Sequence, residues 1–277
     1  MALGGLSYLV AGAYLFSLRI LPGFITKPLY DFLGLERKDF PSISLREFML
    51  LFSIVIVGSL MAPYIFLVGL QFTTASSASL LLVSELFFTI LLAYILLGER
   101  LRGIEVATLL MIAVGIVLTS IGGGLGEFYA GSFTGNIIIV LACMLWAVDN
   151  TLSRIISIRG DVIEVSALKS ILGGIILTST SIALGHYNAI VDLSQIIMII
   201  VVGVISLGNS LLLFFASLYH IGASKTTAIF STHTVFGVVW ALVILGEKLA
   251  ITQALSLSIV AIGICFIYKS HGAKIVA

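Results

Sequence analysis

The chain has 277 residues, of which 60% are hydrophobic and only 10% are charged, and its formal net charge at pH 7 is +1. A mean hydropathy of +1.23 is more than a soluble fold of this size can bury, so lipid is the expected solvent over most of the chain. The near-neutral charge provides no basic surface for nucleic acid. The two cysteines lie inside apolar runs, which argues against a disulfide or metal framework.

Nine stretches are long and apolar enough, or nearly so, to cross a bilayer core of about 30 Å as helices. They lack the alternation of barrel strands, which predicts an all-α integral membrane protein. In chain order the predicted spans are Ala2–Leu21, Phe48–Leu70, Ala75–Leu97, Ala107–Ile121, Asn136–Ile156, Val165–Leu184, Ile196–Leu218, Ala223–Leu245 and Ile251–Tyr268.

The connection Pro22–Glu47 mixes Pro, Gly and charged residues, and we expect a short amphipathic segment in it around Pro28–Leu35. Cytoplasmic loops are enriched in Lys and Arg, so their distribution predicts orientation. With this connection placed inside, every Lys and Arg except Lys248 falls on the inner side. We therefore expect a multi-pass protein of the cell membrane, with a cytoplasmic C-terminus and with Met1 on the outer side.

Residues 69–121 and 217–268 repeat one another at a constant offset of 148 residues. Ala75-Ser76 returns as Ala223-Ser224, and Gly98-Glu99 returns as Gly246-Glu247. Internal duplication of hydrophobic segments is typical of membrane transporters.

The first predicted helix matches the sixth, through Gly12 and Gly174, rather than the fifth. We therefore expect two five-helix repeats, over residues 1–124 and 125–277, with the first helix of the first repeat missing. An odd number of helices per repeat places the two repeats in opposite orientations, which makes an inverted repeat.

The repeated segments, from Ala75-Ser76 to Gly98-Glu99-Arg100-Leu101 and from Ala223-Ser224 to Gly246-Glu247-Lys248-Leu249, resemble the EamA repeat of the drug/metabolite transporter superfamily. Leu145-Trp146-Ala147-Val148-Asp149-Asn150 with Ser153-Arg154 is similar to the opening of such a repeat. The resemblance implies ten helices in two inverted repeats, a central cavity and transport of small organic solutes. Leu86 and Thr234 stand where the family often has proline, which argues against a helix break there.

The doubled Gly-Glu pairs have a structural interpretation. Glycine can adopt the left-handed conformation that ends a helix, and the next carboxylate then lies near the positive N-terminus of the following helix. We therefore interpret Gly98, Glu99, Gly246 and Glu247 as helix-junction residues.

Ionisable side chains inside a membrane span are costly, at about 2.5 to 3.5 kcal/mol on insertion scales, and are therefore functional candidates. Glu85 lies about 15 Å from the end of its predicted helix, at the bilayer midplane. His233 occupies the equivalent position in the second half. Both are predicted to line a central cavity; the alternative is that helix packing satisfies two buried polar groups.

Asp149 and Lys169 lie on neighbouring predicted helices near the inner side. They can form a structural ion pair, or they can take part in gating or substrate binding. The remaining candidates for the cavity are aromatic and amide side chains: Trp146, Asn150, Asn209, Tyr64 and Trp240.

The favoured function is secondary transport of small organic metabolites, with amino acids or related compounds as one candidate class. The chain lacks the G-x-x-x-x-G-K-[ST] motif, so we expect no nucleotide coupling and no cofactor. Proton coupling and facilitated diffusion both stay open. The alternatives are an intramembrane enzyme, although HExxH and GxSxG are absent, or a receptor-like protein without transport activity. We expect a solute and the lipid bilayer as partners, and no enzymatic activity.

Overall fold

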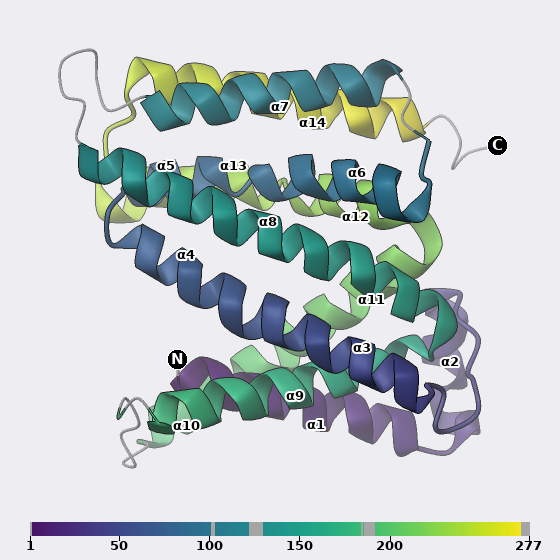
Figure 1. Cartoon of the computed structure of the whole chain (residues 1–277). Coiled ribbons are helices and arrows are strands. Elements are labelled where there is room, and N and C mark those ends of the chain that lie inside the picture. Colours follow the sequence, from purple (N-terminus) through teal and green to yellow (C-terminus); the bar gives the residue numbers. More distant parts are fainter. Residues whose placement is uncertain (1, 101–102, 122–129, 184, 186–191, 273–277) are drawn as a thin grey trace. The chain divides into compact units, whose positions relative to one another are not determined.

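The computed structural model describes residues 2–100, 103–121, 130–183, 185 and 192–272, and every regular element in these residues is a helix. Eight helical segments are long and apolar enough to span a membrane, and Ile251–Phe266 is a shorter apolar helix. The predicted class of all-helical, multi-pass membrane protein is therefore confirmed. The chain forms two compact units, Met1–Leu60 with Leu152–Gly222, and Met61–Thr151 with Ala223–Ala277 (Figure 1).

Unit 1 contains one long antiparallel helix pair and the helices packed on it. Its elements are α1 (Ala2–Ile20), α2 (Gly23–Leu33), α3 (Leu45–Val55), most of the π-helix η1 (Ile56–Met61), the end of α8 (Ala130–Arg159), α9 (Val162–Ala183), α10 (Leu193–Val201), the π-helix η2 (Val202–Gly208) and α11 (Asn209–Ile221). Its core gathers around fully buried Leu15, Leu51, Ile163 and Phe215.

Glycines allow α1 and α9 to pack closely, side by side in Figure 1. A Cβ atom on Gly12 would lie 2.5 Å from Ile171, and one on Gly174 would lie 2.8 Å from Leu9. Small residues serve membrane helices in this way because lipid tails are as apolar as the side chains, so close backbone approach has to supply the packing energy.

The short helix α2 confirms that Pro22–Glu47 contains helical structure, although it begins before the predicted Pro28. Gly34 ends α2 in the left-handed conformation, with φ +62°, and its N–H donates to the Asp31 carbonyl. Glycine takes this conformation without the steric cost of a Cβ atom.

Unit 2 has α7 (Gly103–Ile121) and α14 (Ile251–Gly272) side by side (Figure 1). Its remaining elements are α4 (Ala62–Leu70), α5 (Ala75–Leu81), α6 (Ser84–Leu97), the greater part of α8, α12 (Ala223–Phe230) and α13 (His233–Leu245). Helix α5 packs against α13, and α6 packs against α12.

Two of the predicted continuous spans are broken. Leu82 and Val83 separate α5 from α6, and Ser231 and Thr232 separate α12 from α13. The breaks come just before Leu86 and Thr234, so the helices are interrupted although neither position has proline. The expectation of uninterrupted helices was wrong.

Two other spans begin earlier than predicted because each has a capping box. The Ser44 side chain accepts from the Glu47 N–H while the Glu47 carboxylate accepts from the Ser44 N–H, so α3 begins at Leu45. Asp192 and Gln195 cap α10 in the same way. Such reciprocal bonds satisfy backbone donors that the first helical turn leaves free.

Candidate functional site

Side chains contact two backbone carbonyl groups at the helix breaks of unit 2. The thiol of Cys143, on α8, lies 3.5 Å from the Leu81 carbonyl oxygen. Nδ1 of His233 lies 2.6 Å from the Phe230 carbonyl oxygen. Broken helices inside a membrane need such partners because lipid offers no hydrogen bonds.

Glu85 lies at the first break, in the first turn of α6, and is 6% exposed. The side-chain amide of Asn150, which is 5% exposed on α8, donates to Oε1 of Glu85 at 2.6 Å. The structure thus brings together two of the predicted cavity residues. A buried carboxylate with an amide partner inside a span is an expensive arrangement, and proteins retain it chiefly for function.

Hydroxyl groups on the broken helices add unused hydrogen-bonding capacity. The side chains of Ser84 and Thr89 on α6, Thr227 on α12 and Thr234 on α13 are fully buried, and their oxygens have no hydrogen-bond partner among the described residues. Buried polar groups in proteins normally have partners, so these hydroxyls are suited to water or a polar solute. We call Glu85, Asn150, Ser84 and Thr89 the Glu85 site.

His233 occupies the equivalent place at the second break but has different surroundings. Its half-buried ring lies 4.7 Å from the ring of Phe230, which is 42% exposed. Its described hydrogen bond goes to the preceding turn of the chain and not to Glu85. The shared placement of Glu85 and His233 in one cavity therefore stays a prediction.

The aromatic candidates of unit 2 are more exposed. The half-buried ring of Trp146 lies 5.6 Å from that of Phe66 in a tilted arrangement. Tyr64 is 50% exposed and Trp240 is 56% exposed. Their roles in a cavity stay predictions.

In unit 1, Lys169 is buried on α9, where its ammonium group lies 3.4 Å from Oγ of Ser153 and 5.2 Å from the ring centre of Phe215. A cation over an aromatic face is electrostatically favourable. Asp149 is also buried but belongs to unit 2, so its predicted ion pair with Lys169 stays a prediction.

Asn209, the remaining amide candidate, begins α11 in unit 1. Its Oδ1 accepts a hydrogen bond of 3.2 Å from the hydroxyl of Tyr14 on α1. This contact assigns Asn209 a packing role between two helices of its unit, and any role in a cavity stays a prediction.

The Gly-Glu pairs end their helices in the left-handed conformation, with φ +67° at Gly98 and +64° at Gly246. The described hydrogen bonds of the two carboxylates go to helices that are distant in the sequence, and capping of the next helix stays a prediction. Glu99 accepts from the Ala223 N–H at 3.2 Å and from the Ser224 hydroxyl at 2.6 Å, at the start of α12.

Glu247 makes the counterpart contacts at the start of α5. Its two oxygens accept the backbone N–H groups of Ala75 and Ser76, each at 2.9 Å. Burial acts to raise the pKa of Glu247, and the hydrogen bonds from Ser76 and Ala75 outweigh it, so the pKa is lowered. Each carboxylate therefore stabilises the N-terminus of a helix in the other half of the sequence.

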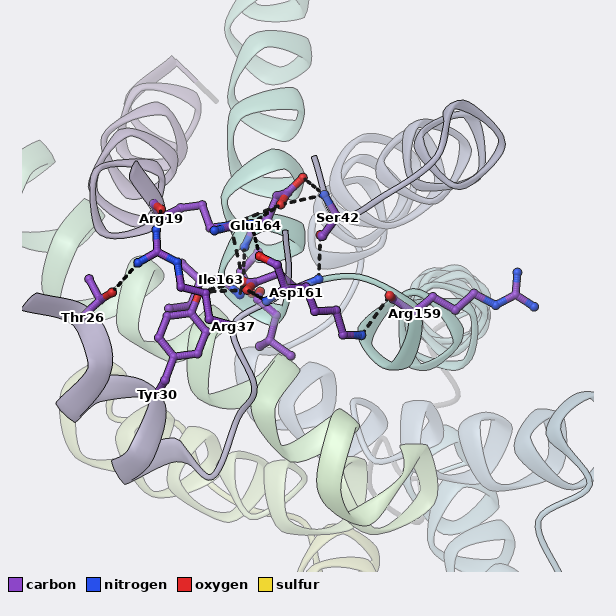
Figure 2. A network of polar contacts seen from close by, with 12 residues as sticks. Arg19, Thr26, Tyr30, Arg37, Ser42, Arg159, Asp161, Ile163 and Glu164 are labelled. Atoms are coloured by element: carbon purple, nitrogen blue, oxygen red, sulfur yellow. Dashed lines mark hydrogen bonds and ion pairs between the residues drawn. The ribbon is translucent and has the colours of Figure 1, made fainter. Parts of the chain in front are cut away.

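A buried ionic network in unit 1 was missed in the sequence (Figure 2). Arg19, at the end of α1, lies 3.1 Å from Glu164 and 3.8 Å from Asp161, and all three side chains are at most 3% exposed. The Tyr30 hydroxyl of α2 donates to Asp161 at 2.9 Å, and the Ser42 N–H donates to Glu164 at 2.9 Å. The network fastens the segment between α1 and α3 to the start of α9.

One sequence signal could have located part of this network. Asp161 followed by Glu164 before an apolar run is a helix-start pattern. Asp161 indeed accepts the N–H groups of Ile163 and Glu164 at 3.0 and 3.2 Å. Burial, followed by the charge of Asp161 and the hydrogen bond to it, raises the pKa of Tyr30 well above its ordinary value.

These features define a multi-pass, all-helical membrane protein with a buried polar site on broken helices. The sequence profile of the EamA-like transporter family matches residues 1–121 and 133–269. The chain therefore belongs to the EamA-like transporter family, within the drug/metabolite transporter superfamily.

Two relatives carry transporter names. The chain is 29% identical over 269 residues to an "uncharacterized transporter" of Methanothermobacter thermautotrophicus, with 97% of this chain and 78% of the relative covered. It is 25% identical over 224 residues to an "uncharacterized transporter" of Clostridium kluyveri, with 73% and 66% covered. A solved crystal structure matches with a TM-score of 0.64 at 17% identity, over 96% of this chain and 86% of that one, which shows a shared fold.

Proposed function

We propose that the chain consists of two inverted repeats, as predicted for residues 1–124 and 125–277, and that nine helices of these repeats span the membrane. Reciprocal contacts support this proposal. Gly12 packs on Ile171 while Gly174 packs on Leu9, and the sequence repeat makes Gly12 equivalent to Gly174 and Leu9 equivalent to Ile171. The same interaction thus occurs twice within unit 1.

A second reciprocal pair supports the repeat in unit 2. The Thr108 hydroxyl donates to the Gly263 carbonyl at 3.2 Å, and the Ser256 hydroxyl donates to the Gly115 carbonyl at 2.8 Å. Thr108 corresponds to Ser256, and Gly115 corresponds to Gly263. Equivalent helices that pack antiparallel are related by a twofold axis across them, which is the geometry of an inverted repeat.

We further propose that the protein is a secondary transporter of small organic metabolites, by alternating access of the two repeats through a central cavity. Amino acids and related compounds are the first class to test. The observation that carries this proposal is the buried contact between Glu85 and Asn150 at a helix break, beside hydroxyls that lack partners. Transporters build solute sites from interrupted helices because the break frees polar groups at membrane depth.

Glu85 is also the proposed proton carrier, with His233 as the second candidate. The distribution of Lys and Arg supports residence in the cell membrane with a cytoplasmic C-terminus.

The test is uptake of radiolabelled amino acids by proteoliposomes that contain the purified protein, with protein-free liposomes as the control. Saturable uptake of at least one compound is expected. An intramembrane enzyme would chemically change an added lipid or peptide without net flux, and a receptor would bind without flux. Either result in place of uptake would reject the transporter proposal.

A further inference from the structure

Helix α2 presents an uncovered apolar face. Phe24 is 79% exposed, Ile25 is 50% exposed and Phe32 is 83% exposed, and Pro28 on the same side is also exposed. At 100° per residue these four positions lie opposite the buried Thr26 and Tyr30. Lys27 and Asp31, both exposed, form a polar strip along one edge between the two faces.

The contacts of the opposite face fix the rotation of α2. Tyr30 donates to both oxygens of Asp161, at 3.0 and 2.9 Å, and Arg37 donates to the Thr26 hydroxyl at 2.9 Å (Figure 2). Nε2 of His220 lies 2.8 Å from the carbonyl oxygen of Leu33 at the end of the helix. The phenylalanines therefore cannot turn inward without breaking these bonds.

The neighbouring segments place α2 at the surface of the bilayer. Only Leu21 and Pro22 separate it from the span of α1, and the next span begins at Leu45. Exposed apolar side chains lie at the ends of both spans that are nearest to α2 in the chain: Ile20 is 63% exposed and Leu45 is 79% exposed. The apolar face of α2 thus lies, along the chain, between two spans whose adjoining ends expose apolar side chains.

We propose that α2 is an interfacial membrane anchor, with Phe24, Ile25, Pro28 and Phe32 inserted among the lipid acyl chains and with Lys27 and Asp31 at the headgroups. Amphipathic helices with large aromatic side chains lie in the interface in this manner. The connection Pro22–Glu47 balances its charges, Lys27, Arg37, Lys38 and Arg46 against Asp31, Glu36, Asp39 and Glu47. Apolar insertion, and not attraction to anionic lipid, therefore holds α2 at the membrane.

Spin labels on single cysteines test the anchor in nanodiscs. The background is Cys265→Ser, because Cys265 is exposed and would take up the label. Cys143 is buried and is kept. The background protein without an added cysteine is the control and should stay unlabelled. Labels at Phe24→Cys and Phe32→Cys are expected to collide more often with oxygen, which concentrates in lipid, than with a water-soluble nickel chelate. Labels at Lys27→Cys and Asp31→Cys should show the opposite preference.

Several results would overturn the proposal. If labels at positions 24 and 32 prefer collisions with the nickel chelate, as labels at 27 and 31 should, the apolar face lies in water. Exclusion of both reagents at 24 and 32 would mean that protein, such as a second copy of this chain, covers the face. If labels at 24 and 32 prefer oxygen only when the nanodiscs contain the anionic lipid phosphatidylglycerol, the attachment of α2 to the membrane is electrostatic. Ile25→Cys provides the same readout if Phe24→Cys does not fold.

A second variant tests whether the buried bonds set the orientation. Tyr30→Phe removes the hydroxyl bound to Asp161 and should reduce the difference in collision preference between positions 32 and 31. The matched control is Tyr94→Phe, because Tyr94 is 52% exposed on α6. An unchanged difference in Tyr30→Phe would reject the orienting role of this contact.

Discussion

The backbone N–H of Ala75 donates a hydrogen bond of 2.9 Å to Oε1 of Glu247, although the two residues lie in opposite halves of the chain. The corresponding bond joins the N–H of Ala223 to Glu99 at 3.2 Å. Each carboxylate faces the positive end of a helix whose first N–H groups lack helical partners. Glu99 and Glu247 thus occupy equivalent positions, and each caps a helix in the other half of the chain.

Replacement of Glu247 should destabilise the protein in a graded way. Glu247→Gln keeps one oxygen acceptor and loses the charge, which costs about 0.3 to 1 kcal/mol at a helix N-terminus. Glu247→Ala removes the cap and should cost about 0.5 to 2 kcal/mol. Thermal unfolding in detergent measures both, with exposed Glu36→Gln as the control. Wild-type melting temperatures in both Glu247 variants would contradict the capping role.

Acid should weaken the Glu247 cap. The folded protein lowers the pKa of Glu247 from its usual 4.5, so its contribution is complete above that pH and is lost as the pH falls through the folded-state value. The melting temperature of Glu247→Gln should therefore approach that of the wild type as the solution is acidified below about pH 4.5. A difference that stays constant down to the lowest accessible pH would exclude this linkage.

Replacement by alanine should affect stability differently at two glycines of α1. A Cβ on Gly12 would lie 2.8 Å from the backbone nitrogen of Ile171, whereas one on Gly4 meets nothing within 4 Å. Gly12→Ala should cost about 1 to 3 kcal/mol through overpacking. Gly4→Ala should be neutral or stabilise by up to about 1 kcal/mol, because alanine favours the helix. Equal unfolding temperatures for both variants would refute the close packing of α1 on α9.

The predicted ion pair of Asp149 and Lys169 can be tested with a double-mutant cycle. Both side chains are buried, and a buried charge is tolerated when an opposite charge neutralises it. Asp149→Asn or Lys169→Met alone should destabilise by about 3 to 5 kcal/mol by stranding a buried charge. The double variant should recover part of this loss in yield and melting temperature. No recovery would reject the pair.

Hydrophobic runs and repeated motifs predict much of the fold because lipid imposes helices of a minimum length on any spanning segment. Glu85 and Asn150 were both recognisable as candidates for the same reason, since polar side chains inside an apolar run demand a partner. Their contact depends on tertiary packing between α6 and α8, so the sequence could not indicate it.

The sequence could not indicate the partners of Glu99 and Glu247. Local sequence suggests the nearby start of the next helix as the partner of each carboxylate, whereas the observed partners are more than 100 residues away along the chain. The network around Arg19 was missed for a related reason. Arg19, Asp161 and Glu164 lie at or beside the ends of predicted spans, where solvent exposure is the ordinary expectation. The folded segment between α1 and α3 contacts Arg19 and Glu164 and buries them.

The pH dependence of transport in Glu85→Gln tests the account most directly. Glutamine still offers an oxygen to the amide of Asn150, so folding should be preserved, but it cannot carry a proton. Wild-type proteoliposomes should take up a labelled substrate at a rate that changes with pH. Glu85→Gln proteoliposomes, with protein that elutes and melts like the wild type, should lose this dependence, and His233→Gln provides the comparison at the second break. A wild-type pH profile in Glu85→Gln would contradict the proposed role of Glu85.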